Sequence, residues 1–339
     1  MRIKKIDISE LEDTVRKALS SKYSTSEIDL MLPVIFFGEL SNTKSHGIIR
    51  VCSTGESILS RNPTGKPKVV IKSKVSKLVE SNGNPGMLMG AIACSEVIKL
   101  AKQSGIGLIG TKGSTSSSGS LTYYIEKIAK QDLIAIVMAR APADVAPHGG
   151  TERLLGTNPI AFGIPSKDKP FLFDMATSAI SYGAVARAKA LNENLPENVA
   201  IDPEGNITRD PSKALDGAFL TFDKSYKGFG LSMIVEILAG VFTGANFLDF
   251  EVGDGWGNLF IAIDPKILSN PDIFKRNVRK LIERIRNSKS VNKEKIRIPG
   301  ENKLRVRDEA LKRGWVEVDE KTLTDIKEFS INKDTNYLK

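Results

Sequence analysis

His46 stands in a short run, SHGIIR, whose residue types could act together on a carbonyl or imine group. A carbon that accepts a hydride leaves its heteroatom in need of a proton, and an imidazole can supply one near neutral pH. Arg50, four positions on, could hold a carboxylate through two parallel hydrogen bonds. The hydroxyl of Ser45 could orient the ring. A loop histidine bonded only to backbone is the structural alternative.

Four other places could contact a ligand. His148 lies in a glycine-rich turn, APHGGT, of the kind that carries function on a rigid scaffold or simply shapes the turn. The run Ser116-Ser117-Ser118-Gly119 could offer backbone amides to phosphate, or be a flexible loop. Lys227 begins an apolar helix, where a positive charge opposes the helix dipole and hints at a bound anion. Asp174 ends a strand before small residues that let a ligand approach the backbone.

A literal GxGxxG, from Gly105 to Gly110, is a misleading match to the dinucleotide fingerprint. That fingerprint needs a strand before it and a helix that opens within it. Here a helix precedes the motif, and the motif itself has the pattern of an apolar strand. A phosphate-binding P-loop is also excluded, because Thr111 stands where its lysine is required.

The composition is that of a globular enzyme of 339 residues, with 41% hydrophobic and 26% charged residues. The first residues include no apolar signal-peptide core, and no apolar run reaches the roughly 18 residues of a membrane span. The two cysteines, Cys52 and Cys94, form neither a disulfide framework nor a metal-ligand spacing. We therefore expect a cytoplasmic protein without a membrane partner and without a bound metal.

The net charge of +9 gathers near the end of the chain, where residues 271–339 hold 19 Lys and Arg against 12 Asp and Glu. The surplus follows helical stretches such as FKRNVRKLIERIRNSK, which is typical of a solvated helix face. A surface that attracts an anionic substrate or nucleotide is the alternative. Aromatic residues do not alternate with the basic ones, so we expect no nucleic-acid partner.

Helices are expected at both ends of the chain, with strands between them, which favours an α+β class over a regular βαβ alternation. Ser9 with Glu12, and Ser24 with Glu27, each predict a helix start with a capping box. Helices are also expected after the turn at 82–86 up to a stop at Gly105, over 123–130 and 176–191, from 227 to about 244, and in the tail beyond 269. Strands are expected over 68–76, 106–110, 133–138, 160–165 and 171–174.

Long ordered motifs resemble the malate/L-lactate dehydrogenase family, which is distinct from the Rossmann-fold lactate dehydrogenases. The family also includes ureidoglycolate, sulfolactate and diketogulonate oxidoreductases and the piperideine/pyrroline-2-carboxylate reductases. The motifs run along nearly the whole chain: SHGIIR, NGNPG with its small-residue helix, VAPHGGTERLLGTNPIAFGIP, FDMATSAISYG, NLPENVAIDPEGNITRDPSKAL, YKGFGLSMIVEILAG and IPGE.

The resemblance implies a mainly antiparallel central sheet in a non-Rossmann NAD(P)-binding domain, over residues 81–267. It also implies a helical domain, formed by residues 1–80 with 268–339, that carries the dimer contacts and the substrate site. The protein is then expected to be a homodimer that uses NAD(H) or NADP(H) on a small-molecule carboxylate substrate.

By the same resemblance, His46 is the proton donor, Ser45 its relay partner and Arg50 the carboxylate anchor. Other residues expected at the substrate are His148, Thr157 and Tyr182. The residues expected at the cofactor are Ser116, Ser117, Ser118, Gly119, Phe173, Asp174, Met175, Ala176, Tyr226, Lys227, Gly300, Glu301, Asn302, Lys303, Leu304, Arg305 and Val306.

Three functions follow as hypotheses. The first is hydride transfer between nicotinamide and a small 2-oxo or 2-hydroxy acid, and the second is reduction of a cyclic imine carboxylate. The third is a cofactor-binding protein with impaired catalysis, because Ser116-Ser117-Ser118 replaces a motif that carries a histidine in many members. Ala139-Arg140-Ala141 likewise stands in place of a Thr-Asn-Ser segment, so the substrate stays open.

Overall fold

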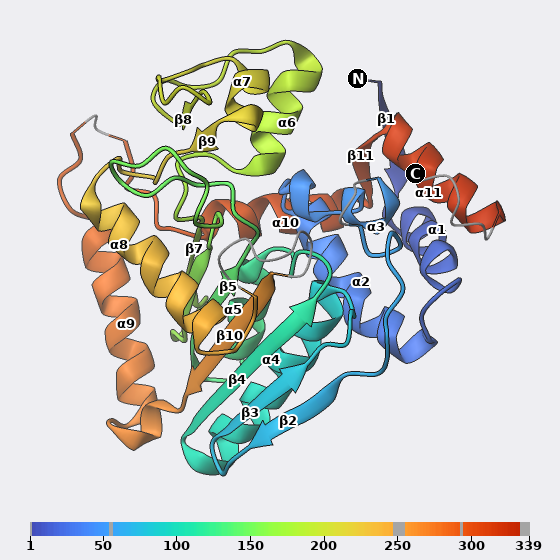
Figure 1. Ribbon diagram of the computed structural model, residues 1–339. Helices are drawn as coiled ribbons and strands as arrows, with labels where there is room; N and C mark the ends of the chain where they lie inside the picture. The colour runs from blue at the N-terminus through green and yellow to red at the C-terminus, as the bar shows by residue number, and fades with distance from the viewer. Residues whose placement is uncertain (1, 54–56, 247–254, 292–293, 333–339) are drawn as a thin grey trace.

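A seven-stranded sheet runs through the centre of the fold, with its strands in the order β2-β3-β4-β10-β5-β6-β7 (Figure 1). The computed structural model describes residues 2–53, 57–246, 255–291 and 294–332. Neighbouring strands are antiparallel except β3 and β4, which are parallel, so the expected α+β class with a mainly antiparallel sheet is confirmed. The strands are β2 (Lys68–Lys72), β3 (Ser76–Glu80), β4 (Ile106–Ser114), β10 (Trp256–Ile263), β5 (Ile134–Arg140), β6 (Ile160–Ile164) and β7 (Phe171–Met175).

Helices cover both faces of this sheet. On one face α4 (Gly86–Ser104) packs on β4 and β10, and α5 (Leu121–Ala129) packs on β5 and β6. On the other face α8 (Tyr226–Val235) continues into the π-helical turn η2 (Glu236–Val241), which packs on β5 and β10. The middle of the sheet is thus buried between two layers, which holds its side chains in fixed positions, whereas β2 at one edge is exposed.

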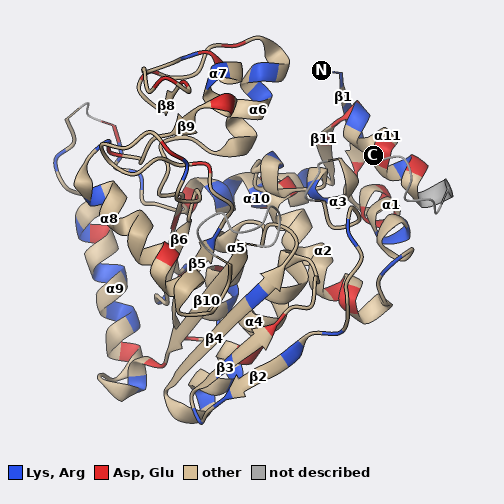
Figure 2. Cartoon of the chain, viewed as in Figure 1, with Lys and Arg blue, Asp and Glu red and all other residues tan. Residues whose placement is uncertain are grey.

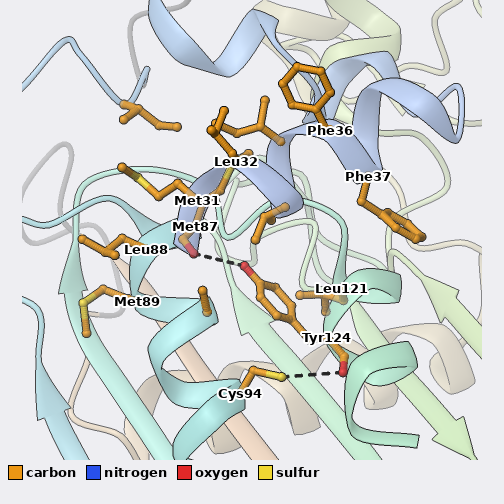
Figure 3. Close-up of a cluster of buried hydrophobic side chains, with 14 of the residues drawn as sticks. Met31, Leu32, Phe36, Phe37, Met87, Leu88, Met89, Cys94, Leu121 and Tyr124 are labelled. Carbon is orange, nitrogen blue, oxygen red and sulfur yellow. Dashed lines mark hydrogen bonds between the residues drawn. The ribbon is translucent and has the colours of Figure 1, made fainter. Parts of the chain in front are cut away.

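The core is most closely packed where α4 meets α5 (Figure 3). Tyr124 is fully buried, and its hydroxyl donates to the carbonyl oxygen of Ser118 at 2.6 Å. A Cβ atom at Gly90 would lie 2.4 Å from that hydroxyl oxygen, so glycine is needed where α4 passes the ring. Met87, Leu88 and other apolar residues of α4 complete the cluster.

The two ends of the chain meet in a second, smaller sheet, in which β1 (Ile3–Asp7) pairs antiparallel with β11 (Trp315–Asp319). Helices α1 (Ile8–Leu19) and α11 (Glu320–Asn332) pack together, and α2 (Thr25–Leu40) contacts both α4 and α10 (Glu301–Arg313). Figure 1 shows this blue and red group beside the larger sheet. β2 and β3 precede residue 81 but hydrogen-bond into the larger sheet.

The remaining elements connect these parts. A small unit with its own apolar cluster contains α6 (Tyr182–Leu191), β8 (Ala200–Ile201), α7 (Pro211–Asp216) and β9 (Ala218–Phe219). Short helical turns are η1 (Lys44–His46), α3 (Ile49–Cys52) and η3 (Pro265–Ile267), and α9 (Pro271–Arg286) is a long surface helix. Within the described ranges, no helix has the length and apolar character that crossing a membrane requires.

Several sequence-based boundaries are corrected by the structure. The capping box of Ser24 and Glu27 is present, but the one expected from Ser9 and Glu12 is not, because α1 already begins at Ile8. The strand expected over 68–76 is a hairpin of two strands, and the helix expected from 176 begins only at Tyr182. Gly105 ends α4 with φ of +80°, and the rest of the GxGxxG match lies within β4.

Arg307 on α10 supplies a test of how the C-terminal segment is attached. Its guanidinium donates to the buried carboxylate of Glu126 on α5 at 2.5 Å and lies over the ring of Phe37. Glu126 keeps Lys130 as a partner at 2.7 Å, so Arg307→Ala removes one charge-assisted hydrogen bond and should lower the free energy of unfolding by about 2 kcal/mol. Urea unfolding at fixed protein concentration measures this loss.

The matched control is Arg305→Ala on the same helix, whose pair with Glu309 is exposed. Exposed pairs contribute about 0–1 kcal/mol, so this variant should unfold almost as the parent does. Equal losses in the two variants would contradict the role given to the buried pair.

Candidate active site

His46 lies in a tight turn between α2 and α3 and is half-buried. The hydroxyl of Ser45 is 2.9 Å from the Nδ1 atom of His46, and the Nε atom of Arg50 donates to the carbonyl oxygen of Ser45 at 2.8 Å. The structure therefore brings together the three residues that the SHGIIR run singled out. A bonded Nδ1 fixes the plane of the imidazole and leaves its Nε2 atom directed elsewhere.

Asp174, at the end of β7, is the second anchor of the site. One of its carboxylate oxygens accepts hydrogen bonds from the backbone amide of Thr122 at 3.1 Å and from the Thr122 hydroxyl at 2.5 Å. The same oxygen is 3.1 Å from the ammonium group of Lys303 on α10. Asp174 thus joins the end of a strand to the first turn of α5 and to α10.

Gly300 allows α10 to approach β7 closely enough for this ion pair. It precedes α10 with φ of +85°, and a Cβ atom there would lie 2.4 Å from the carbonyl oxygen of Leu172. Any larger residue would push the start of α10 away from the strand. The IPGE motif therefore has a physical reason: its glycine sets the distance over which Lys303 reaches Asp174.

His46 lies close enough to Arg50, Lys303 and Asp174 to respond to their charges. Burial lowers its pKa from 6.5 to about 4, and the nearby cations Arg50 and Lys303 lower it as well, while Asp174 acts in the opposite direction. Charged groups from segments distant in the sequence thus surround one imidazole. At neutral pH its imidazole is uncharged in the free protein.

The start of α6 contacts the turn that carries His46. A Cβ atom at Gly183 would lie 2.8 Å from the Cβ atom of Ser45, so α6 begins in direct contact with the His46 turn. Tyr182, the preceding residue, is half-exposed. Thr157 is also half-buried, and its carbonyl oxygen accepts the backbone amide of Thr177 at 3.0 Å.

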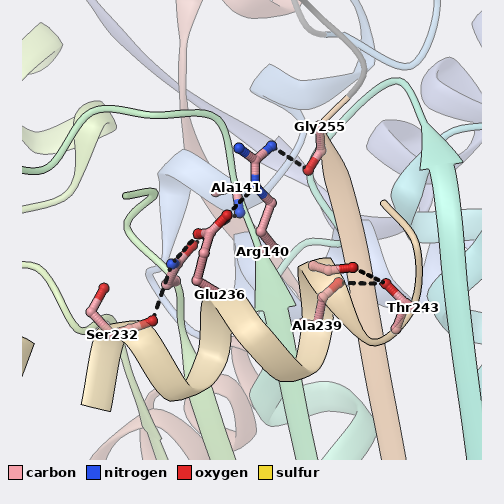
Figure 4. Close-up of polar contacts among 9 residues, drawn as sticks. Arg140, Ala141, Ser232, Glu236, Ala239, Thr243 and Gly255 are labelled. Atoms are coloured by element: carbon pink, nitrogen blue, oxygen red, sulfur yellow. Dashed lines mark hydrogen bonds and ion pairs between the residues drawn. The ribbon is translucent and has the colours of Figure 1, made fainter. Parts of the chain in front are cut away.

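Arg140 fills a buried position behind the Thr157 loop (Figure 4). Its Nε atom donates to the carboxylate of Glu236 at 2.8 Å, and Nη1 donates to the carbonyl oxygen of Gly255 at 2.5 Å. The second oxygen of Glu236 accepts from the side chain of Asn158 at 2.7 Å. The network connects β5, η2 and the Thr157 loop, which explains how the charge of Arg140 is tolerated in the protein interior.

The structure places other predicted residues away from this centre or turned inward. The hydroxyls of Ser116 and Ser117 accept from the backbone amides of Gly86 and Gly119, and Ser118 donates to the side chain of Asn258. This loop therefore has its side chains inside the protein. His148 lies on an exposed turn, and Tyr226 and Lys227 lie at the exposed start of α8.

A groove of about 570 Å³ runs beside α10 and β7, on the side opposite the core. Apolar residues Pro170, Phe171 and Leu304 line it together with Glu301 and Arg305, so it includes part of the predicted cofactor segment 300–306. Further charged residues surround it: Asp168 and Lys169 of the connection between β6 and β7, Arg279, Glu283 and Arg286 of α9, and Asp308, Glu309 and Lys312 of α10. Figure 2 shows these mixed charges along both helices.

Sequence reasoning missed Thr122, Glu39 and the Arg140 network. Thr122 gave no local signal, because its role depends on a strand 52 residues away. The only signal for Arg140 was its departure from the Thr-Asn-Ser pattern, which did not reveal its partner. Among the described residues, no three His, Cys, Asp or Glu side chains are grouped so as to hold a metal ion.

Comparisons with known proteins agree with this geometry. The L-sulfolactate dehydrogenase of Methanothermobacter thermautotrophicus is 35% identical over 78% of this chain and 79% of its own length. A Delta(1)-pyrroline-2-carboxylate/Delta(1)-piperideine-2-carboxylate reductase of Pseudomonas syringae pv. tomato is 31% identical over 92% of each. The solved sulfolactate dehydrogenase of Methanocaldococcus jannaschii superposes with a TM-score of 0.88 at 29% identity, covering 97% of both chains.

The family profile described as malate/L-lactate dehydrogenase matches residues 6–327, which is nearly the whole chain. The relatives above are dehydrogenases and a reductase, so the chain is an oxidoreductase. The chain belongs to the malate/L-lactate dehydrogenase family.

Proposed function

We propose that the protein transfers a hydride between a nicotinamide dinucleotide and a small 2-oxo or 2-hydroxy acid. The observations that carry the proposal are the Ser45–His46–Arg50 contacts and the nearby Asp174–Lys303 pair, whose charges act on the His46 imidazole. One imidazole for proton transfer beside a guanidinium is the minimum that such a reaction requires of a protein. The names of the sulfolactate and malate/L-lactate relatives favour the same substrate class.

The proposed roles follow from the contacts. Arg50, whose Nε atom is fixed by Ser45, binds the substrate carboxylate and sets the carbonyl carbon beside His46. The Nε2 atom of His46 gives a proton to the carbonyl oxygen in reduction and removes it from the hydroxyl in oxidation. Ser45 holds Nδ1, so the ring does not rotate during the transfer.

The residues present fit a nicotinamide cofactor, which would supply or accept the hydride. Asp174 and Lys303 would hold its reactive end next to His46, together with Phe173, Met175 and Ala176 of the same strand end. Phe171 lies three residues along β7, a distance of about 10 Å, and lines the groove beside α10. At about 570 Å³ the groove is in the usual range for ligand sites and would hold the adenosine half.

Reduction of a cyclic imine carboxylate is the second candidate, favoured by the piperideine-2-carboxylate relative. Initial rates with pyruvate, oxaloacetate, sulfopyruvate and Δ1-piperideine-2-carboxylate, each with NADH and NADPH, separate the two. Turnover of a 2-oxo acid with at least tenfold higher kcat/KM than the imine supports the proposal. The reverse order supports the imine reductase, and cofactor binding without turnover of any of them supports an impaired protein.

His46 is the residue whose loss tests the chemistry most simply. His46→Ala should lower kcat by roughly two to four orders of magnitude, because a general acid of this kind contributes that much. Cofactor affinity, followed by nicotinamide fluorescence, should stay within a few-fold, and the urea midpoint should show that the variant is folded. Unchanged turnover would refute the role of His46.

The pH dependence follows from the depressed pKa of His46, about 4 in the free protein. Reduction needs the protonated ring, so its kcat/KM should rise close to tenfold for each unit by which the pH falls from 8 to 5. Oxidation needs the neutral ring, so its kcat/KM should be flat over that range. Lys303→Met removes a cation that lowers the pKa, and the reduction profile should then level off at a higher pH.

A break near pH 6.5 in the parent protein, or no movement of the break in Lys303→Met, would contradict this electrostatic account. Lys99→Met is the control, because this lysine is exposed on α4, where it pairs with Glu96. Its profile should overlie that of the parent.

We further propose that the protein is a homodimer formed through α8 and η2. Five exposed apolar residues follow one face of this segment and define an apolar stripe: Met233, Ile234, Ile237, Val241 and Phe242. Exposed apolar patches on a soluble protein commonly mark a contact with another molecule. A twofold axis would let the stripe cover its own copy, which is the commonest arrangement in homo-oligomers.

Replacing Ile237 and Phe242 together by Glu should convert the dimer to a monomer of 37.0 kDa in sedimentation equilibrium. The charges would oppose each other across the twofold axis and would be costly to bury. Ile207→Glu, at an exposed apolar residue outside both the stripe and the helical domain of residues 1–80 and 268–339, should stay dimeric. A monomeric parent protein, or a double variant that remains dimeric, would exclude this interface.

A further inference from the structure

Glu39, in the last turn of α2, is a buried carboxylate that the chemistry above does not use. It is 3% exposed, although it lies next to the turn that carries His46. Glutamate is seldom buried to this degree unless its charge is paired and its oxygens are hydrogen-bonded. The contacts of Glu39 therefore indicate which part of the structure its buried carboxylate holds in place.

The two carboxylate oxygens of Glu39 bind the His46 turn on both sides. One oxygen accepts the backbone amide of Ile48 at 3.2 Å, two residues after the histidine. The other pairs with the ammonium group of Lys44, two residues before it. Lys44 in turn donates to the carbonyl oxygen of Glu317 on β11 at 2.6 Å, so the turn is also attached to the C-terminal segment.

The carboxylate of Glu39 lies where α2 and the His46 turn pack closely together. A Cβ atom at Gly47 would lie 2.2 Å from a carboxylate oxygen of Glu39, and one at Gly38 would lie 2.3 Å from the carbonyl oxygen of His46. Glycine at both positions lets α2 and the turn touch through their backbones. The distance between α2 and the His46 turn is therefore set by these backbone and Glu39 contacts rather than by the side chains of the turn.

We propose that Glu39 is a positioning residue for His46: with Lys44 and the Ile48 amide, its carboxylate fixes the turn so that the imidazole points at the carbonyl oxygen of the substrate. This inference rests on the proposed function for its kinetic consequence, but the position of the ring is a structural claim of its own. A displacement of about 1 Å at a catalytic group can lower turnover about a hundredfold.

Glu39→Gln is the direct test, because it keeps the size of the side chain and removes the charge that holds Lys44. Histidine-labelled protein reports on the ring without any substrate, since His46 and His148 are the only two histidines and His148→Gln assigns the signals. In the parent, burial, Arg50 and Lys303 hold the His46 pKa near 4 against the effect of Asp174. When the turn loosens, water reaches the ring, and its pKa should rise by at least one unit towards 6.5.

The kinetic expectation for Glu39→Gln is a 10- to 100-fold lower kcat with cofactor affinity within twofold of the parent. The matched control is Glu96→Gln, whose pair with Lys77 at 2.5 Å is also partly buried but joins α4 to β3. It should leave the His46 pKa and kcat unchanged. Glu39→Gln/Lys44→Met should be at most a few-fold slower than Glu39→Gln alone, because the second substitution additionally removes only the bond from Lys44 to the carbonyl oxygen of Glu317.

An unchanged His46 pKa together with a kcat within twofold of the parent, in folded Glu39→Gln, would overturn the proposal. If Glu39→Gln does not fold, Lys44→Met, at a half-exposed residue, must show the same changes in smaller measure, or the proposal fails. The NMR titration also separates two failures: a raised pKa in a protein that turns over none of the tested acids supports the role of Glu39 and counts against the proposed function.

Discussion

The rest of the site depends on the hydrogen bonds and the ion pair of the Asp174 carboxylate. It lies at the end of an edge strand and binds both the first turn of α5 and Lys303 of α10. These three segments come from different parts of the chain, and the packing of α2 against α10 brings the His46 turn to the same place. Losing this one pair would remove the ionic link between the end of β7 and α10.

Buried charges around the site are consistently paired, and each pair joins elements rather than stabilising one of them. Asp174 with Lys303 ties β7 to α10, Glu39 with Lys44 ties α2 to the His46 turn, and Arg140 with Glu236 ties β5 to η2. Pairs of this kind add little net stability, because desolvation offsets their attraction. Their effect is to fix geometry, which is what proton and hydride transfer require.

Much of the fold was predictable, because its signals are local. The Ser24 capping box, the Gly105 helix stop and the apolar strand through 106–110 each depend on neighbouring residues. β10 was missed although it is a central strand, since its run of apolar residues lies beyond the long connection from α8 and gives no periodicity of its own. The start of α6 was placed too early, because small residues after Asp174 suit a helix and a ligand-binding loop equally.

The candidate site was predictable only in part. Ser45, His46 and Arg50 are close in sequence, so their spacing alone suggested a common task. The pairing of Asp174 with Lys303 spans 129 residues, and no local pattern reveals it; the family resemblance named both residues but not their contact. Arg140 departed from the family pattern, and only the fold shows that Glu236 and Asn158 compensate its charge.

The most direct test of the account is a crystal structure with a nicotinamide dinucleotide and a non-reacting 2-oxo acid analogue bound together. The account predicts that the C4 atom of the nicotinamide lies about 3–3.5 Å from the carbonyl carbon. It also predicts the carboxylate of the analogue on Arg50 and its carbonyl oxygen within hydrogen-bonding distance of His46 Nε2. A nicotinamide ring bound away from His46, or a carboxylate held without Arg50, would contradict it.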